Sequence, residues 1–276
     1  MTSSNLFDEL LRIILLKDPA KKCSATRALQ NSGSHSYTHL IHLFPQAPAE
    51  TPVSKAIAIT EAGLPDRLEL VPPRQLKKRS IQQQRGRNVL MHAIAHIEFN
   101  AINLALDAAY RFRNQPDAYY SDWIDVAADE ARHFLLIQDY LNRHGCDYGD
   151  YPAHNGLWDM AVRTQDDVVA RMALVPRVLE ARGLDVTPQI IKRLTRAEDH
   201  DAVGILRTIY NDEIEHVKIG SRWFNYQCEQ QQLEPRTTFL EMIKLHLHGD
   251  LKGPFNFEAR LLAGFDDQEL DYLRNL

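Results

Sequence analysis

The chain has 276 residues, of which 44% are hydrophobic and 25% are charged, and its formal net charge at pH 7 is −5. This length and apolar content permit a substantial core and favour one compact domain with extensions over two domains. The acidic balance argues against a nucleic-acid-binding protein. Cys23, Cys146 and Cys228 contain no Cys-x-x-Cys pair and leave an odd number, which favours reduced thiols over a disulfide framework or a structural zinc site.

The N-terminal segment and the apolar runs bear on where the protein resides. Asp8 and Glu9 precede a short leucine-rich stretch, which is unlike a signal peptide. No apolar run in the sequence approaches membrane-spanning length by inspection. We therefore expect a cytoplasmic protein that does not bind a membrane.

The predicted elements are helices throughout. Residues 5–16 form an amphipathic pattern, residues 24–32 start a second helix, and the prolines between His42 and Pro73 predict an irregular arm. The bundle helices are expected at residues 80–113, 121–144 and 166–182, and from about Pro188 or Asp199 to Gln227. The roughly twenty residues from Gly145 are long enough to return along a bundle, as a crossover between its second and third helices requires. This predicts an N-terminal arm, a bundle and a C-terminal arm at residues 1–79, 80–228 and 229–276.

Two copies of one short motif are the most informative feature of the chain. Glu130-Ala-Arg-His133 and Glu213-Ile-Glu-His216 both read Glu-x-x-His, and a lone glutamate precedes each one, Glu98 by 32 residues and Glu180 by 33. Positions i and i+3 of a helix share one face and can bind one metal ion. Ferritin-like bundles hold two iron or manganese ions between two such helices and two helices with one inward glutamate each. The predicted metal ligands are Glu98, Glu130, His133, Glu180, Glu213 and His216.

The helical neighbours of these glutamates predict whether they are buried. The positions around Glu98 are apolar, namely Met91, Ile94, Ala95, Ala101, Ile102 and Ala105. The positions around Glu215 are polar, namely Thr208, Asn211, Asp212, Lys218 and Arg222. We expect Glu215 to face water, and it serves as an internal control for the face assignment.

Several buried carboxylates in one bundle need compensation. A bare carboxylate in a medium of low dielectric has an idealised cost of tens of kcal/mol, so the glutamates must take up protons or bind metal. Two divalent cations would neutralise four glutamates while both histidines stay neutral. The alternative is that the glutamates pair with arginine or lysine at the ends of the bundle.

Glu180 has the least regular surroundings of the six. Pro176 lies about one turn before it and Gly183 follows it, so Glu180 stands between a predicted kink and a helix-ending glycine signal. Irregular helical turns often occur at functional sites. The alternative is a short helix whose last turn frays.

Each motif is preceded by an aspartate. Asp129 and Asp212 point away from the histidine of their own motif and toward a neighbouring helix. Metal-bound histidines usually donate their free N–H to a carboxylate, so Asp129 is predicted to orient His216 and Asp212 to orient His133. The alternative is ordinary surface acidity.

Several other residues allow either a structural or a functional interpretation. Tyr210 lies one turn before Glu213 and is either a core tyrosine or a catalytic redox relay. His92 and His96 are one turn apart, and His96 is predicted on a wetter face than Glu98, which favours ordinary histidines over a separate metal site. Surface or lid positions are expected for His35, His39 and His42.

A basic run precedes the bundle. It contains no acidic residue and consists of Arg74, Lys77, Lys78, Arg79, Arg85 and Arg87. Such a run is usually a solvated helix start, yet it can steer an anionic partner such as RNA or a phosphorylated metabolite. The net charge and the lack of interleaved aromatic residues argue against RNA.

Longer segments carry a resemblance to known families. Asp-Glu-Ala-Arg-His at 129–133 is similar to the signature of ferritin-like di-iron proteins, and nearly the whole chain resembles the bacterial ferritin-like family known as domain of unknown function 455. The resemblance to that family rests on Leu-Val-Pro-Pro-Arg at 70–74, His-Ala-Ile-Ala-His-Ile-Glu at 92–98, Ala-His-Asn-Gly-Leu-Trp at 153–158, Glu-Ala-Arg-Gly-Leu-Asp at 180–185 and Lys-Gly-Pro-Phe-Asn at 252–256. It implies an all-α, ferritin-like four-helix bundle with a carboxylate-bridged di-metal centre at the six predicted ligands. Broader relatives include oxygen-activating hydroxylases, one of which acts on a modified tRNA base.

Three classes of function fit these observations. An oxidase or hydroxylase would use two metal ions and dioxygen on a small-molecule substrate. A ferroxidase or metal-storage protein would need a cage-forming oligomer, which the long arms disfavour. A non-catalytic bundle would use metal only for stability. Oxygen and nitrogen ligands without thiolate suit iron, manganese or a mixed pair, and affinity order also allows adventitious zinc.

Overall fold

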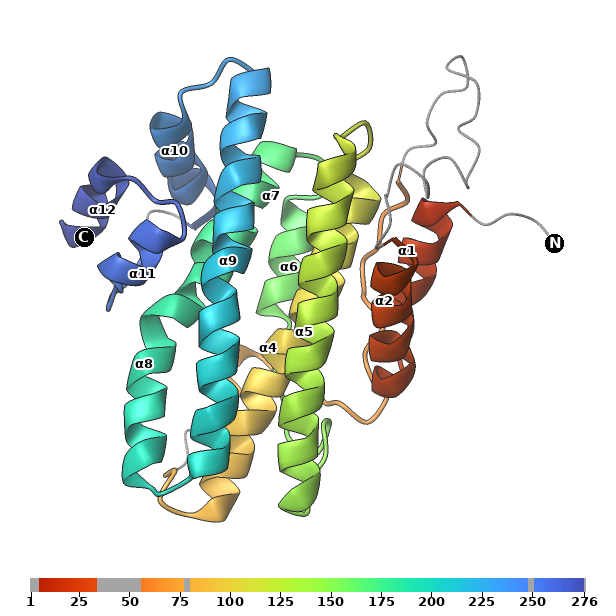
Figure 1. The fold of residues 1–276 in the computed structure, drawn as a ribbon, viewed down its shortest axis with the longest axis vertical. Coiled ribbons are helices and arrows are strands. Elements are labelled where there is room, and N and C mark those ends of the chain that lie inside the picture. The colour runs from red at the N-terminus through yellow and green to blue at the C-terminus, as the bar shows by residue number, and fades with distance from the viewer. Residues whose placement is uncertain (1–4, 34–55, 77–79, 248–250, 276) are drawn as a thin grey trace. The chain divides into compact units, whose positions relative to one another are not determined.

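The computed structural model describes residues 5–33, 56–76, 80–247 and 251–275, which divide into two compact units, Met1–Val162 and Arg163–Leu276 (Figure 1). Among the described residues, the regular secondary structure is helical apart from an isolated parallel β-bridge between Leu70 and Ala153. This confirms the predicted all-α class. The division into arms and bundle stays a prediction, and His35, His39, His42 and residues 77–79 lie outside the described residues.

The first unit contains α1 (Leu6–Ile14), α2 (Pro19–Gly33), the short 3₁₀ helix η1 (Pro73–Gln75), α4 (Gln84–Arg111), α5 (Asp117–Arg143) and most of α6 (Gly156–Arg163). Helix α1 begins where the Asn5 side chain accepts a hydrogen bond from the Asp8 backbone N–H, as an N-cap does. The predicted helix at residues 5–16 is confirmed, as are the helices predicted at residues 80–113 and 121–144, within a few residues at their ends.

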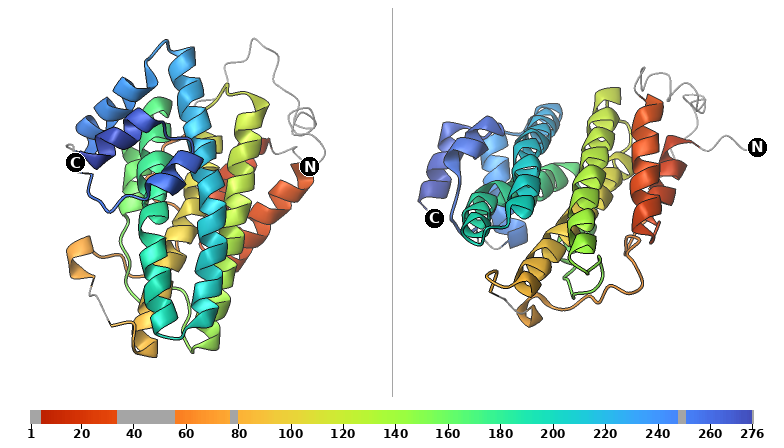
Figure 2. Two further views of the ribbon diagram at one scale, coloured as in Figure 1. Left: turned by 60° about the vertical axis from the view of Figure 1, so that its left-hand side comes forward. Right: turned by 60° about the horizontal axis from the view of Figure 1, so that its bottom comes forward.

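Helices α4 and α5 form the centre of the first unit and lie side by side in both figures (Figure 2). Only residues 112–116 join them, so the two helices are antiparallel neighbours. Phe99 of α4 packs against Phe134 of α5 with ring centroids 5.0 Å apart, and both rings are fully buried. Burial of each ring contributes about 1.5–3 kcal/mol to stability.

Lys22 forms hydrogen bonds with three separate segments of the first unit. Its buried Nζ donates hydrogen bonds to the carbonyl oxygens of Ile14 and Gly63, each at 2.9 Å, and to the side-chain oxygen of Asn103 on α4. Three acceptors match the three N–H donors of an ammonium group. Burial lowers the pKa of Lys22 to about 7.

Helix α4 also contains a long apolar stretch. By length and composition it could cross a membrane, with a mean hydropathy of 1.3 over its most apolar window, although inspection of the sequence predicted no such run. In this structure 72% of that window is buried inside the protein, a property that the core helices of soluble proteins share.

The second unit contains α7 (Val168–Leu174), the π-helix η2 (Val175–Glu180), α8 (Ala181–Arg196), α9 (His200–Gln230), α10 (Pro235–Leu247), α11 (Phe257–Leu262) and α12 (Asp267–Arg274). The prediction that the third helix ends near Arg182 is wrong, because the helical run passes Gly183 and contains Pro188 inside α8. Of the two predicted starts of the next helix, the second is confirmed: Asp199 caps α9 by accepting a hydrogen bond from the Ala202 N–H.

The π-helix forms where Pro176 interrupts the helix. Proline lacks the N–H that an α-helix needs, and its ring crowds the preceding turn, so a wider turn relieves the clash. Helix α9 approaches this turn through Gly220. A Cβ atom on Gly220 would lie 2.2 Å from the Cβ atom of Pro176, so no larger residue fits without a shift of the backbone.

The C-terminal segment of the second unit is fastened to α8 and η2. The Arg182 guanidinium donates to the carbonyl oxygens of Lys252, Gly253 and Pro254, and Arg260 donates to both carboxylate oxygens of Asp185 at 2.9 and 2.7 Å. These contacts join the motif at residues 180–185 to the C-terminal segment that contains the motif at residues 252–256.

A second buried ion pair reaches η2 from α12. Arg177 donates to the two carboxylate oxygens of Glu269 at 2.7 and 2.8 Å, and its guanidinium carbon lies 4.4–4.7 Å from the ring centroids of Phe224, Phe239 and Phe265. Burial lowers the pKa of Arg177, while the Glu269 carboxylate opposes this effect. The pair fixes the turn of η2 that precedes Glu180.

Candidate metal-binding site

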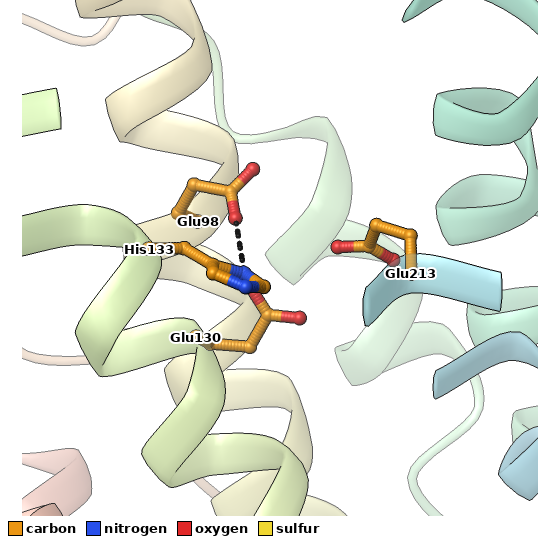
Figure 3. Close-up of side chains that lie close together, drawn as sticks. All are labelled: Glu98, Glu130, His133 and Glu213. Atoms are coloured by element: carbon orange, nitrogen blue, oxygen red, sulfur yellow. Dashed lines mark hydrogen bonds and ion pairs between the residues drawn. The ribbon is translucent and has the colours of Figure 1, made fainter. Parts of the chain in front are cut away.

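Three of the predicted ligands come together in the first unit (Figure 3). Glu98 lies 13 residues before the end of α4 and Glu130 lies 13 residues after the start of α5, so both are about 20 Å from the connection and stand at the same level. His133 follows Glu130 by one turn. Its Nδ1 atom is 3.2 Å from an oxygen of Glu98 and 3.4 Å from an oxygen of Glu130.

This triad has the composition of a metal site. The side chains of Glu98, Glu130 and His133 are 5%, 1% and 0% exposed, and one ligand atom of each lies within 4.8 Å of the others. Ligands that bind one ion at about 2.0–2.2 Å lie at most about 4.4 Å apart, and the two contacts of Nδ1 fall inside that limit. The donor set fits a divalent ion that accepts oxygen and nitrogen.

Two opposed effects act on the pKa of His133. Burial lowers the pKa, while the hydrogen bonds and charges of Glu130 and Glu98 raise it. The effect of the carboxylates is larger, and the pKa of His133 is about 11. Without metal, a protonated imidazole therefore carries the positive charge between the two carboxylates. Metal must displace that proton, because a metal-bound imidazole is neutral.

The second unit holds the other Glu-x-x-His motif on α9. Nδ1 of His216 is 3.9 Å from an oxygen of Glu213, and the two side chains are 3% and 12% exposed. Glu180 is the last residue of η2, a helix that packs on α9. Among the described residues, Glu180, Glu213 and His216 do not form a cluster whose ligand atoms all lie within 4.8 Å of one another.

The position of Glu180 explains that difference. Glu213 lies 13 residues after the start of α9, whereas Glu180 lies 16 residues before the end of α8. At a rise of about 1.5 Å per residue, the two glutamates differ by about 4.5 Å in level along their helices. Metal binding by Glu180 stays a prediction.

The control residue behaves as expected. Glu215 is 58% exposed and forms an ion pair of 3.0 Å with Lys218, which confirms the face assignment on α9. Asp129 is 43% exposed and lies 3.0 Å from Arg132, and Asp212 is partly buried on α9. Their predicted roles beside His216 and His133 stay predictions.

Tyr210 is partly buried on α9, where its hydroxyl oxygen accepts a hydrogen bond of 2.9 Å from the side chain of Asn256. This leaves the Tyr210 proton available for donation to another group. Sequence inspection singled out Tyr210 but missed Asn256. The available signal was the Lys-Gly-Pro-Phe-Asn motif, which ends at this residue.

His92 and His96 are both buried, so the expectation of a wetter face for His96 is wrong. The ring of His96 lies 2.8 Å from the Tyr148 hydroxyl through Nδ1 and 3.0 Å from the His154 carbonyl oxygen through Nε2. Nε2 of His92 accepts a hydrogen bond from the Gly149 N–H at 2.8 Å. Burial lowers the pKa of both rings to about 4, so they hold the 148–154 segment on α4 as neutral groups.

The protonation of His133 gives a prediction for the metal-free protein. Its pKa is about 6.5 in the unfolded chain and about 11 in the fold, so the contact stabilises the fold fully below pH 6.5 and is lost as the pH rises through 11. Between pH 7 and 9 we expect metal-free protein to lose up to about 1.4 kcal/mol of unfolding free energy per pH unit. Metal-loaded protein should lose less, and this is measurable by urea unfolding at each pH.

Two variants test the assignment of this pH dependence. His133→Asn should remove the extra slope of the metal-free protein, whereas His200→Asn, at an exposed position, should keep it. The same unfolding free energy for metal-free and metal-loaded protein at every pH would contradict the prediction.

The comparisons with known proteins agree with the sequence resemblance. The chain is 45% identical over 219 residues to an uncharacterized protein of Haemophilus influenzae, which covers 77% of this chain and 76% of that protein. No solved structure matches the chain. The family described as protein of unknown function DUF455 matches residues 15–271. The chain therefore belongs to the DUF455 family.

Proposed function

We propose that the protein is a ferritin-like, dinuclear metal carboxylate protein that uses dioxygen to oxidise or hydroxylate a small molecule. The observation that carries the proposal is the buried triad Glu98, Glu130 and His133, in which two carboxylate oxygens lie 3.2 and 3.4 Å from one imidazole nitrogen. The repeat of the same motif at Glu213 and His216 on α9 supports a second ion.

In this proposal the two motifs and the two lone glutamates share one centre, with Glu180 as the fourth carboxylate. Four carboxylates and two neutral imidazoles balance two divalent cations, so the centre is neutral when loaded. We propose two iron ions. Two manganese ions or a mixed pair of iron and manganese would suit the same ligands. Two bound ferrous ions would supply electrons for the reduction of dioxygen.

The chain's own residues would do the remaining work. The carboxylates would fix the ions, and His133 would give up its proton as metal binds. Phe99 and Phe134 are fully buried, pack together and directly follow Glu98 and His133 on α4 and α5, and they would keep water from the carboxylates. Tyr210 would donate a proton or an electron one turn from Glu213, with its hydroxyl held by Asn256.

Dioxygen uptake tests the proposal. Protein loaded anaerobically with ferrous iron should consume dioxygen in an oxygen electrode, with no more than about two irons bound per chain. The Glu130→Ala variant should consume none above the buffer rate, while Glu215→Ala should match the parent protein. Uptake of far more iron would instead indicate storage, and inert ferrous protein would leave manganese chemistry or a structural metal.

A further inference from the structure

Helices α8 and α9 of the second unit border an open groove of about 540 Å³. Every residue that lines it belongs to these two helices. The volume falls within the range of about 300–1,000 Å³ that small-molecule sites occupy. The groove is therefore large enough for a metabolite.

Three cationic side chains are among the residues that line the groove. Lys192 and Arg196 lie one turn apart on α8, and Arg207 lines the groove from α9. In the part of the chain that the structure describes, none of these three exposed side chains forms an ion pair with a carboxylate. Like charges one turn apart repel by a few tenths of a kcal/mol, and a bound anion would turn this cost into attraction.

The groove also has an apolar part, which includes a residue one turn from the candidate ligand Glu213. Pro188, Ile191 and Tyr210 line it and are partly buried. On α9, Arg207 lies one turn before Tyr210 and Glu213 one turn after it, about 60° to either side. Arg207 and Glu213 are thus about 9 Å apart along the helix axis.

We propose that this groove binds a small molecule with one phosphate or carboxylate group and an apolar body, and that this molecule is the substrate of the proposed metal centre. The anionic group binds Lys192, Arg196 and Arg207. The apolar body lies along Pro188 and Ile191, and its far end reaches Tyr210, whose hydroxyl proton is free to be donated. The second half of this proposal rests on the proposed function.

Binding of defined probes to the metal-loaded protein tests the groove. Octyl phosphate and octanoate should each bind at least about tenfold more tightly than inorganic phosphate or octanol, as followed by calorimetry, because only they carry both an anionic group and an apolar chain. Lys192→Gln and Arg207→Gln should each weaken the binding of octyl phosphate by roughly fivefold, the effect of one partly exposed charge contact. Arg193→Gln changes an exposed cation of α8 outside the groove and should bind like the parent protein.

Several outcomes would overturn the groove assignment. Equal weakening by Arg193→Gln and Arg207→Gln would show a diffuse charge effect, and equal affinity for inorganic and octyl phosphate would show a site for an anion without an apolar body. Binding of a single-stranded RNA oligonucleotide that Arg207→Gln abolishes would identify the surface as a nucleic-acid contact instead. All variants have exposed substitutions, and their melting temperatures should match the parent's.

The substrate assignment is tested separately from the metal chemistry. Octyl phosphate should raise the rate of dioxygen uptake by ferrous protein. Arg207→Gln should remove that increase, whereas Arg193→Gln should retain it. Tight binding with unchanged uptake would overturn the substrate role and leave the groove. Tight binding to a protein that never consumes dioxygen would instead overturn the proposed function.

Discussion

Replacement of Glu213 by alanine is expected to remove at least one of two metal ions per chain, whereas Glu215→Ala should retain both. The two glutamates lie two residues apart on α9 but on different faces, with side chains 12% and 58% exposed. Loss of a carboxylate ligand should weaken binding by more than about 100-fold, because even supporting residues of metal sites cost 10–100-fold. Elemental analysis of desalted protein, with concentration from amino-acid analysis, measures the number of ions.

A matched pair of variants on α5 provides the same test. Glu130→Ala should lose metal, and Asp139→Ala should not, because Asp139 is 71% exposed and pairs with Arg143. Equal metal loss in Glu213→Ala and Glu215→Ala would show that the face assignment on α9 does not govern binding. Full metal content in Glu130→Ala would remove the triad from the site.

The second large effect is expected at the buried ion pair between α12 and η2. Glu269→Ala should lower the free energy of unfolding by about 3–5 kcal/mol, because it leaves the Arg177 guanidinium buried without its carboxylate. The change also removes the capping box at Asp266, which accounts for about 1 kcal/mol of the total. Urea unfolding monitored by circular dichroism measures the loss.

Two further variants separate the buried charge from the loss of a side chain. Asp271→Ala lies on the same helix but breaks an exposed ion pair with Arg274, so we expect a change within about 0.5 kcal/mol. Arg177→Met combined with Glu269→Ala should be more stable than Glu269→Ala alone, since methionine fits among the three phenylalanine rings without a charge. A double variant less stable than the single one would show that packing of the guanidinium matters more than its charge.

These contacts also bear on the candidate metal site. Arg177, Arg182 and Asp185 lie within five residues of Glu180, and each is held by a side chain or carbonyl from residues 252–269. The turn that carries Glu180 is thus positioned by the C-terminal segment. Residues 252–269 therefore position Glu180 and do not only cover a helix.

The amino-acid sequence by itself determined the helical class, the positions of α1, α4, α5 and α9, and the faces of Glu98, Glu130, His133 and Glu213. Apolar spacing along one helix is a local property, so it shows which side of that helix is buried before any partner is known. The alternation of partly buried Glu213 and exposed Glu215 follows from the same periodicity.

Tertiary structure alone decided the course of residues 166–196. Gly183 and Pro188 are local signals for a helix end, and they cost about 1 and 3 kcal/mol inside a helix. The helix continues because contacts from about 70 to 90 residues away, at Arg260 and Glu269, outweigh those costs. Pro176 is accommodated because Gly220 of α9 leaves room for its ring. Such packing depends on the three-dimensional neighbours of each residue, which local periodicity does not contain.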